Sequence, residues 1–364
     1  TTARNELGPL DAIGIASATR TMDNDTMAAP LDRAGLFFQE CGCEILHYKC
    51  CSTFDSAAGK GNLVTAARSL VCQTGQDVVP VIGGQPSLGR FCTFSNLFAA
   101  FKEDVFRLDR HPVMRNHPST PMDEADLTQH LKTLGATQVK AVTWPELETK
   151  SPTERSKRLE LAAPEFLVFD AMTSEHIDRI GQVLRQADRP IAVLGASSVA
   201  EAWFSETADI PEKAQPSLAG PVLGVSGSLS QVTRLQVAAA KSFEKLEVSP
   251  ATVASDRTRT AIVERAADLL TSGNNVLVTS SAQRGPNAIS SKTGFAEQCG
   301  KLVQDSLERA PIRRLAIAGD LDQFGDGHVQ CLLLLDHFRV GGPGLSLGAG
   351  PPRHGRAVGT LRPH

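Results

Sequence analysis

The 364-residue sequence lacks the features that would tie it to a membrane or to nucleic acid. No apolar run approaches the roughly 20 residues of a membrane-spanning helix. The net charge is −3, so no basic surplus is available to hold a nucleic acid or an anionic membrane. The first residues also lack the charged and apolar regions of a signal peptide, which favours a cytoplasmic protein. A phosphorylated substrate would therefore need a local basic pocket.

Standard cofactor and metal motifs are missing as well. Neither G-x4-G-K-[ST] nor G-x-G-x-x-G occurs, which excludes the usual P-loop and dinucleotide sites. The eight cysteines include Cys41-x-Cys43 and the neighbours Cys50 and Cys51. Zinc sites generally use C-x2-C or wider spacing with a second matching pair, so we interpret these residues as reduced, partly buried thiols and predict no metal site.

The sequence does contain a recurring unit, in which a short apolar run is followed by a small polar segment and then a helical stretch. Such runs occur at residues 12–18, 44–51, 77–82, 166–170, 191–194, 222–225, 276–279 and 315–318. Runs that are apolar on both faces are typical of buried parallel strands, and amphipathic stretches such as residues 175–186 and 257–270 separate them. This alternation predicts an α/β fold with two doubly wound domains and mainly parallel sheets.

Three segments depart from that rhythm. Residues 84–122, rich in Phe, Pro, His and Asn, predict an inserted hairpin or active-site loop in the first domain. Residues 201–220 have little periodicity and predict the linker, which gives domains of residues 1–212 and 213–364. After Asp336 there is no acidic residue, and we expect the Gly-, Pro- and Arg-rich tail to pack poorly.

A polar cluster follows the run at residues 44–51, where ligands of open α/β sheets bind. Lys49 could neutralise a carboxylate, Ser52 could bind a sugar hydroxyl, and Asp55 could orient or deprotonate an alcohol. The alternative is a capped turn in which Asp55 and Ser56 merely start a helix near Leu63. The residues alone leave both interpretations open.

A second cluster spans residues 115–122 and contains Asn116, His117 and Thr120. His117 is a candidate base, although a lone loop histidine is more often a plain hydrogen-bonding residue. Arg20 and Arg90 are further candidates for binding an anion, with an ordinary surface role as the alternative.

In the second half, Gly227, Ser228 and Ser230 form a small loop that leads into the helical stretch 231–241. The free N–H groups of a helix N-terminus suit phosphate. Gly319 and Asp320 follow another predicted strand in the same way. On these motifs alone a plain strand–helix turn is favoured.

Together, these clusters resemble those of the four-carbon acid sugar kinases, and the 3-oxo-tetronate kinase branch in particular. The matching stretches are residues 48–56, 61–62, 89–90, 96–98, 114–122, 170–173 and 226–230. The resemblance implies a sugar-acid domain followed by an ATP-binding domain, and phosphorylation of a terminal hydroxyl with ATP and Mg²⁺. It implies that the sugar side is lined by Lys49, Ser52, Asp55, Asn62, Arg90 and residues 116–120, and the nucleotide side by Ser228 and the Gly319 loop.

The sequence departs from the family pattern in three places. The family's opening Ala-Asp-Asp-x-Thr-Gly-Ala type loop is not found at its start. Gly319 is followed by Asp320 where a Gly-Gly-x-Thr-Ser loop is expected, and the likeness ends near residue 320, as a shifted reading frame would produce. A catalytically inactive protein that binds sugar acids is therefore the second hypothesis, and another nucleotide-dependent α/β enzyme is the third. The sequence does not identify the stereochemistry of the substrate, the general base or the oligomeric state, for which a homo-oligomer is one option.

Overall fold

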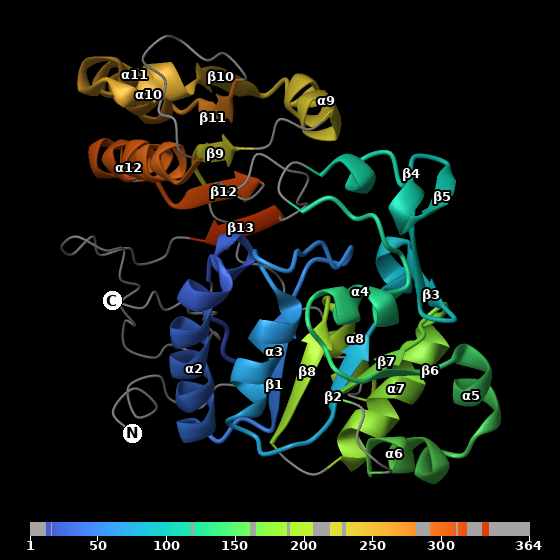
Figure 1. Ribbon diagram of the computed structural model, residues 1–364. Coiled ribbons are helices and arrows are strands. Elements are labelled where there is room, and N and C mark those ends of the chain that lie inside the picture. The colour runs from blue at the N-terminus through green and yellow to red at the C-terminus, as the bar shows by residue number, and fades with distance from the viewer. Residues whose placement is uncertain are drawn as a thin grey trace. The chain divides into compact units, whose positions relative to one another are not determined.

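The computed structural model of the chain describes residues 12–15, 17–117, 120–160, 165–187, 190–206, 219–227, 231–281, 292–310, 312–318 and 330–334. These residues form two compact units, residues 12–206 and residues 219–334, each with its own sheet and core (Figure 1). Within these ranges no helix is both long and apolar enough to cross a membrane.

The first unit is built on a five-stranded sheet in the order β1-β8-β2-β7-β6, and all of its neighbouring strands are parallel. The strands are β1 (Ile45–Lys49), β2 (Val79–Ile82), β6 (Val139–Val142), β7 (Phe166–Phe169) and β8 (Ile191–Gly195). β2, β7 and β8 are buried along their whole length, as expected for central strands that are covered on both faces. The strands predicted at residues 44–51, 77–82, 166–170 and 191–194 are confirmed.

Helices flank this sheet (Figure 1). They are α2 (Asn24–Glu40), α3 (Leu63–Val71), α4 (Leu127–Thr133), α5 (Trp144–Thr149), α6 (Pro152–Glu160), α7 (Ser174–Gln186) and α8 (Ser198–Trp203), with short 3-10 helices η1 (Thr19–Thr21), η2 (Pro86–Leu88), η3 (Leu108–Arg110) and η4 (Met114–Asn116). Alternate strand residues supply two cores. Val79 and Val81 pack in the core that includes α3 and α4, whereas Ile82 packs in the core that includes α7 and α8.

An antiparallel sheet of β3 (Arg90–Thr93), β4 (Asn96–Phe101) and β5 (Asp104–Arg107) interrupts the parallel alternation. It confirms the hairpin predicted for residues 84–122. Leu97 and Ala99 of β4 are fully buried in the core that α4 shares, so this small sheet packs on the first unit through one face.

The second unit has a sheet in the order β10-β11-β9-β12-β13. The strands are β9 (Val222–Ser226), β10 (Phe243–Val248), β11 (Asn275–Ser280), β12 (Arg314–Ala318) and β13 (Gln330–Leu334), and the helices are α9 (Gln231–Ala239), α10 (Pro250–Ala254), α11 (Asp256–Thr271) and α12 (Lys292–Arg309). All pairs are parallel except β12 with β13. The predicted class, α/β with mainly parallel sheets in two doubly wound domains, is confirmed.

Four strand assignments differ from expectation, since β13 was not among the predicted strands. Residues 12–15 form only an isolated bridge, and Ala12 and Gly14 are exposed, so the strand predicted at residues 12–18 is wrong. β6 and β10 were not expected, because charged and partly exposed residues such as Lys140 and Glu244 break their apolar pattern. The tail predicted to pack poorly lies outside the described residues.

Candidate functional site

The centre of the candidate site is Asp55, which lies in the loop between β1 and α3. Its side chain is completely buried, and both carboxylate oxygens accept hydrogen bonds. Oδ1 accepts from the hydroxyl of Thr53 at 2.8 Å. Oδ2 accepts from Nε of Arg20 at 3.0 Å and also pairs with the second nitrogen of that guanidinium, Nη2. The carboxylate of Asp55 is therefore held by hydrogen bonds to both of its oxygens, within the polar cluster predicted to follow β1.

Arg20 reaches Asp55 from the 3-10 helix η1. The loop that carries Asp55 packs against the backbone of η1 at Gly61. Gly61 has a left-handed φ of +58°, and a Cβ there would lie 2.3 Å from the carbonyl oxygen of Arg20. The N–H of Gly61 donates to the carbonyl of Met22 at 2.8 Å. The loop thus needs glycine at this point in order to lie directly against the backbone of η1.

The second polar cluster meets the first at the same carboxylate. The hydroxyl of Thr120 donates to Oδ2 of Asp55 at 3.2 Å. Nδ1 of His117 accepts the N–H of Thr120 at 3.1 Å and lies 2.9 Å from its hydroxyl oxygen. Both His117 and Thr120 are buried. Two loops that are distant in sequence therefore converge on one ion pair.

His130 supports this loop from α4, a role that the sequence did not reveal. Its Nε2 lies 2.8 Å from the hydroxyl of Ser56, which donates to the carbonyl of Phe54 at 2.8 Å. Phe54 itself has a left-handed φ of 54°. Burial lowers the pKa of His130, so the ring is held in its neutral form. The only sequence signal was a histidine on the buried face of an amphipathic helix, which is usually a core residue.

Arg90 provides a second guanidinium near the same loop. Its Nε donates to the hydroxyl of Ser52 at 3.2 Å, and Nη1 donates to the carbonyl of Leu88 at 2.7 Å. Burial lowers the pKa of this guanidinium, and the neighbouring Cys51 acts in the opposite direction. Burial first, and then the charge of Asp55, raise the pKa of the Cys51 thiol, which favours its neutral form.

The remaining predicted residues of the sugar side do not join this network. Lys49 is exposed at the end of β1. Asn116 is exposed and donates to the carbonyl of Pro112 at 3.1 Å. Whether these two side chains contact a ligand stays a prediction.

Asn62 is buried, and its amide is occupied by the fold. Its oxygen caps α3 by accepting the N–H groups of Val64 and Thr65 at 2.9 and 3.0 Å, and its nitrogen donates to Ala58 and Leu134 carbonyls at 3.0 and 2.9 Å. The alternative in which Asp55 and Ser56 cap this helix is therefore wrong. A ligand contact of Asn62 would have to replace one of these four bonds.

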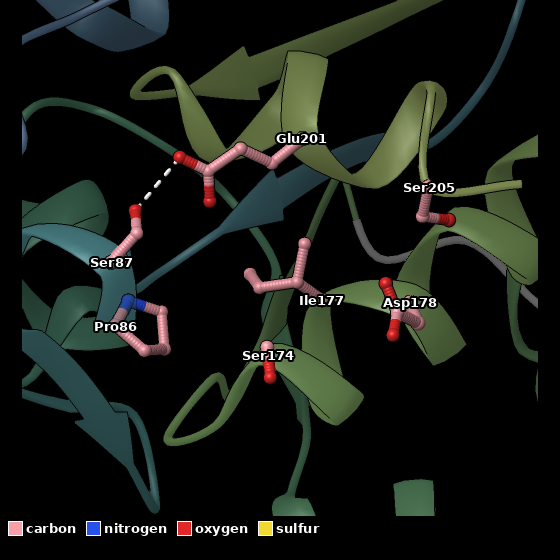
Figure 2. A pocket seen from close by; sticks show the side chains of 7 residues that line it. All are labelled: Pro86, Ser87, Ser174, Ile177, Asp178, Glu201 and Ser205. Carbon is pink, nitrogen blue, oxygen red and sulfur yellow. Dashed lines mark hydrogen bonds between the residues drawn. The ribbon is translucent and has the colours of Figure 1, made fainter. Parts of the chain in front are cut away.

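A separate hollow of about 370 Å³ lies between η2, α7 and α8 (Figure 2). Its lining residues are Pro86, Ser87, Ser174, Ile177, Asp178, Glu201 and Ser205. The carboxylate of Glu201 accepts hydrogen bonds from Ser87 at 2.8 Å and from Gln85 at 2.7 Å. Two carboxylates and no lining cation make this hollow a poor match for an anionic substrate, and it shares no residue with the Asp55 network.

In the second unit, the carboxyl ends of β9 and β11 meet. The hydroxyl of Ser280 donates to the carbonyl of Gly227 at 2.9 Å. The hydroxyl of Ser226 is buried and has no hydrogen-bond partner. A buried donor without a partner is costly, and it is accounted for if a ligand oxygen completes it. From the sequence, Gly227 was a candidate contact and Ser226 lay in the family-like stretch 226–230, but the Ser226 hydroxyl was not singled out, because a hydroxyl at the end of a buried strand gives no signal of its own.

The other predicted nucleotide-side residues, Ser228, Ser230, Gly319 and Asp320, lie outside the described residues. Across the residues that are described, no group of three or more His, Cys, Asp or Glu side chains could hold a metal ion.

Comparisons with known proteins cover both units. Residues 1–203 match the model of a sugar-binding N-terminal domain family, and residues 223–319 match that of a nucleotide-binding C-terminal domain family. A 3-oxo-isoapionate kinase of Paraburkholderia graminis is 30% identical over 362 residues, which cover 90% of this chain and 75% of the relative. A 3-oxo-tetronate kinase of Escherichia coli is 29% identical over 234 residues, which cover 63% of this chain and 58% of that relative.

Two crystal structures share the fold. A Salmonella typhimurium protein aligns with a TM-score of 0.64 and 23% identity over 85% of this chain and 77% of its own. A Haemophilus influenzae protein aligns with a TM-score of 0.59 and 20% identity over 86% of this chain and 77% of its own.

Proposed function

Because this chain belongs to the four-carbon acid sugar kinase family, we propose that it transfers the terminal phosphoryl group of ATP to the terminal hydroxyl of a four-carbon sugar acid. The names of its relatives favour a 3-oxo acid as the acceptor. In this proposal the first unit binds the acid and the second binds the nucleotide.

The observation that carries the proposal is the convergence of Arg20, Thr53 and Thr120 on the buried carboxylate of Asp55. A sugar acid presents one carboxylate and several hydroxyls. Guanidinium groups pair with carboxylates, and the oxygens of threonine and aspartate match hydroxyls. Arg20 from η1 and Arg90 from β3 bring two guanidinium groups to the loop that carries Asp55, and in this proposal they attract the acid's carboxylate.

Asp55 would act as the general base of the transfer. An acceptor hydroxyl that takes the place of the Thr120 hydroxyl at Oδ2 would give its proton to Asp55 while its oxygen bonds to the terminal phosphorus of ATP. The bond from that phosphorus to the bridging oxygen breaks, and ADP leaves. Phosphoryl transfer depends mainly on positioning and charge neutralisation, which guanidinium groups supply.

On the nucleotide side, the hydroxyls of Ser226, Ser228 and Ser230 and the backbone N–H groups of Gly227, Gly319 and Asp320 would donate to phosphate oxygens. The buried, partnerless hydroxyl of Ser226 fits such an oxygen. Mg²⁺ bound with the nucleotide would neutralise phosphate charge during the transfer.

The test is ADP formation from ATP–Mg²⁺ in the presence of 3-oxo-tetronates. The wild-type chain should produce ADP only with the acceptor, and Asp55→Asn should lower kcat about 10²- to 10⁴-fold, since general-base catalysis typically contributes that much. Asp104→Asn, which changes an exposed aspartate of β5, serves as the matched control.

Thermal stabilisation by the acid without any ADP formation would instead support the inactive, acid-binding alternative. Turnover that survives Asp55→Asn unchanged would remove Asp55 from the mechanism.

A further inference from the structure

The stretch Asp170-Ala171-Met172-Thr173 matches the family, yet the proposed mechanism gives it no task. Asp170 follows β7 directly and is fully buried. Its position at the carboxyl end of a central strand is where functional side chains of such sheets occur.

Asp170 accepts hydrogen bonds from three backbone N–H groups. Oδ2 accepts from Phe94 at 2.7 Å and from Trp144 at 3.1 Å, and Oδ1 accepts from Ser95 at 2.8 Å. The thiol of Cys92 adds a longer contact at 3.5 Å. Burial raises the pKa of this carboxyl, and the three N–H groups act against that change. The carboxylate therefore serves backbone donors that come from two separate segments.

Two of those donors belong to a strained turn. Thr93 pairs with Asn96, so Phe94 and Ser95 alone form the turn between β3 and β4. Both have left-handed φ angles, 46° and 66°. A two-residue turn of this kind is favoured by Asn-Gly, whereas phenylalanine and serine adopt its left-handed backbone conformation only at an energetic cost. Asp170 stabilises a conformation that the turn sequence itself disfavours.

The same hairpin carries Arg90 at the start of β3. Cys92 exchanges two backbone hydrogen bonds with Ala171, at 3.0 and 3.1 Å, which ties β3 to the segment that follows Asp170. Gly84 allows this close approach, because a Cβ there would lie 2.4 Å from the carbonyl oxygen of Ala171. The turn and the middle of β3 are thus both fixed to the end of β7, and Arg90 projects from the fixed strand to Ser52.

We propose that Asp170 is a positioning residue that holds the turn between β3 and β4 in its left-handed conformation and thereby places Arg90 against the Ser52 loop. The effect on the sugar acid rests on the proposed function, whereas the effect on the hairpin does not. In this proposal Asp170 acts on acid binding through the hairpin, by way of its bonds to Phe94 and Ser95.

The experiment compares wild type, Asp170→Asn, and Asp170→Asn combined with Phe94→Asn and Ser95→Gly, which install a turn that adopts this conformation without help. Crystal structures give the distance between Nε of Arg90 and Oγ of Ser52, which is 3.2 Å now. Asp170→Asn should break that contact and raise the KM for the sugar acid about tenfold with little change in kcat. The installed turn should restore both the contact and the KM.

Two controls separate positioning from general damage. Asp104→Asn changes an exposed aspartate of the same small sheet and should leave the KM unchanged. In an Arg90→Ala background, Asp170→Asn should add no further rise in KM, because the two changes act through one interaction.

The proposal is overturned if Asp170→Asn keeps the Arg90–Ser52 contact, or if the installed turn fails to restore it. If the wild-type chain shows no turnover of any sugar acid, the proposed function fails, but the crystallographic comparison still decides the role of Asp170.

Discussion

Replacing Gly61 by alanine tests whether the close contact between the loop and η1 holds the site together. Gly61 has φ +58°, and its new Cβ would lie 2.3 Å from the carbonyl oxygen and 3.0 Å from the carbonyl carbon of Arg20. A left-handed non-glycine residue costs about 1–2 kcal/mol, and displacing the packed backbone adds about 1–3 kcal/mol. We therefore expect Gly61→Ala to lower the free energy of unfolding of the first unit by about 2–5 kcal/mol.

Two other glycines separate these contributions. Gly59 lies in the same loop, has no left-handed φ and has open space around its Cβ position, so Gly59→Ala should stay within about 0.5 kcal/mol of wild type. Gly75 has φ +69° and open space, so Gly75→Ala should show the conformational cost alone, about 1–2 kcal/mol.

Tryptophan fluorescence during urea unfolding is a suitable assay, because both tryptophans of the chain, Trp144 and Trp203, belong to the first unit. Gly61→Ala should also raise the KM for the sugar acid, since it moves the backbone that carries Arg20. If Gly61→Ala were as stable as Gly75→Ala, the backbone at Arg20 would move aside for the new Cβ at little energetic cost. A destabilised protein with an unchanged KM would remove Arg20 from acid binding.

Three further predictions concern buried polar side chains. Asn62→Ala should lower the free energy of unfolding by about 2–4 kcal/mol, because α3 loses its cap and the buried Leu134 carbonyl loses its side-chain donor. Asn62→Asp should be no more stable in urea unfolding, because its carboxylate faces the Ala58 and Leu134 carbonyls. Burial lowers the pKa of His130 from 6.5, so the unfolded chain binds more protons as the pH falls below that value and stability declines. His130→Gln should flatten this decline in unfolding midpoints measured between about pH 7 and pH 5, and an unchanged slope would contradict the assignment. Ser226→Ala should keep or raise the calorimetric unfolding temperature while weakening nucleotide binding about 2- to 10-fold, and unaltered binding would exclude a phosphate contact.

Much of the architecture could be read from the residues. Strands buried on both faces have continuous apolar runs, so β2, β7, β8 and β9 were recognisable, as was the polar cluster after β1. β6 and β10 were not predicted, because their exposed positions carry charged residues that interrupt the continuous apolar run. The run at residues 12–18 has the right composition but no place in the sheet, which local pattern cannot reveal.

The sequence by itself determined which residues could bind an anion, because residue chemistry and strand ends are local properties. Only the tertiary structure decided which of them meet. Thr120 reaches Asp55 across 65 positions, and His130 reaches Ser56 across 74, because the packing of α4 and the hairpin against the sheet brings them together. The same packing brings the Leu134 carbonyl to the amide of Asn62 and holds the turn at Phe94 in a conformation that its own residues disfavour. Long-range packing, and not local preference, therefore decides which polar groups are satisfied within the fold and which are left to meet a ligand.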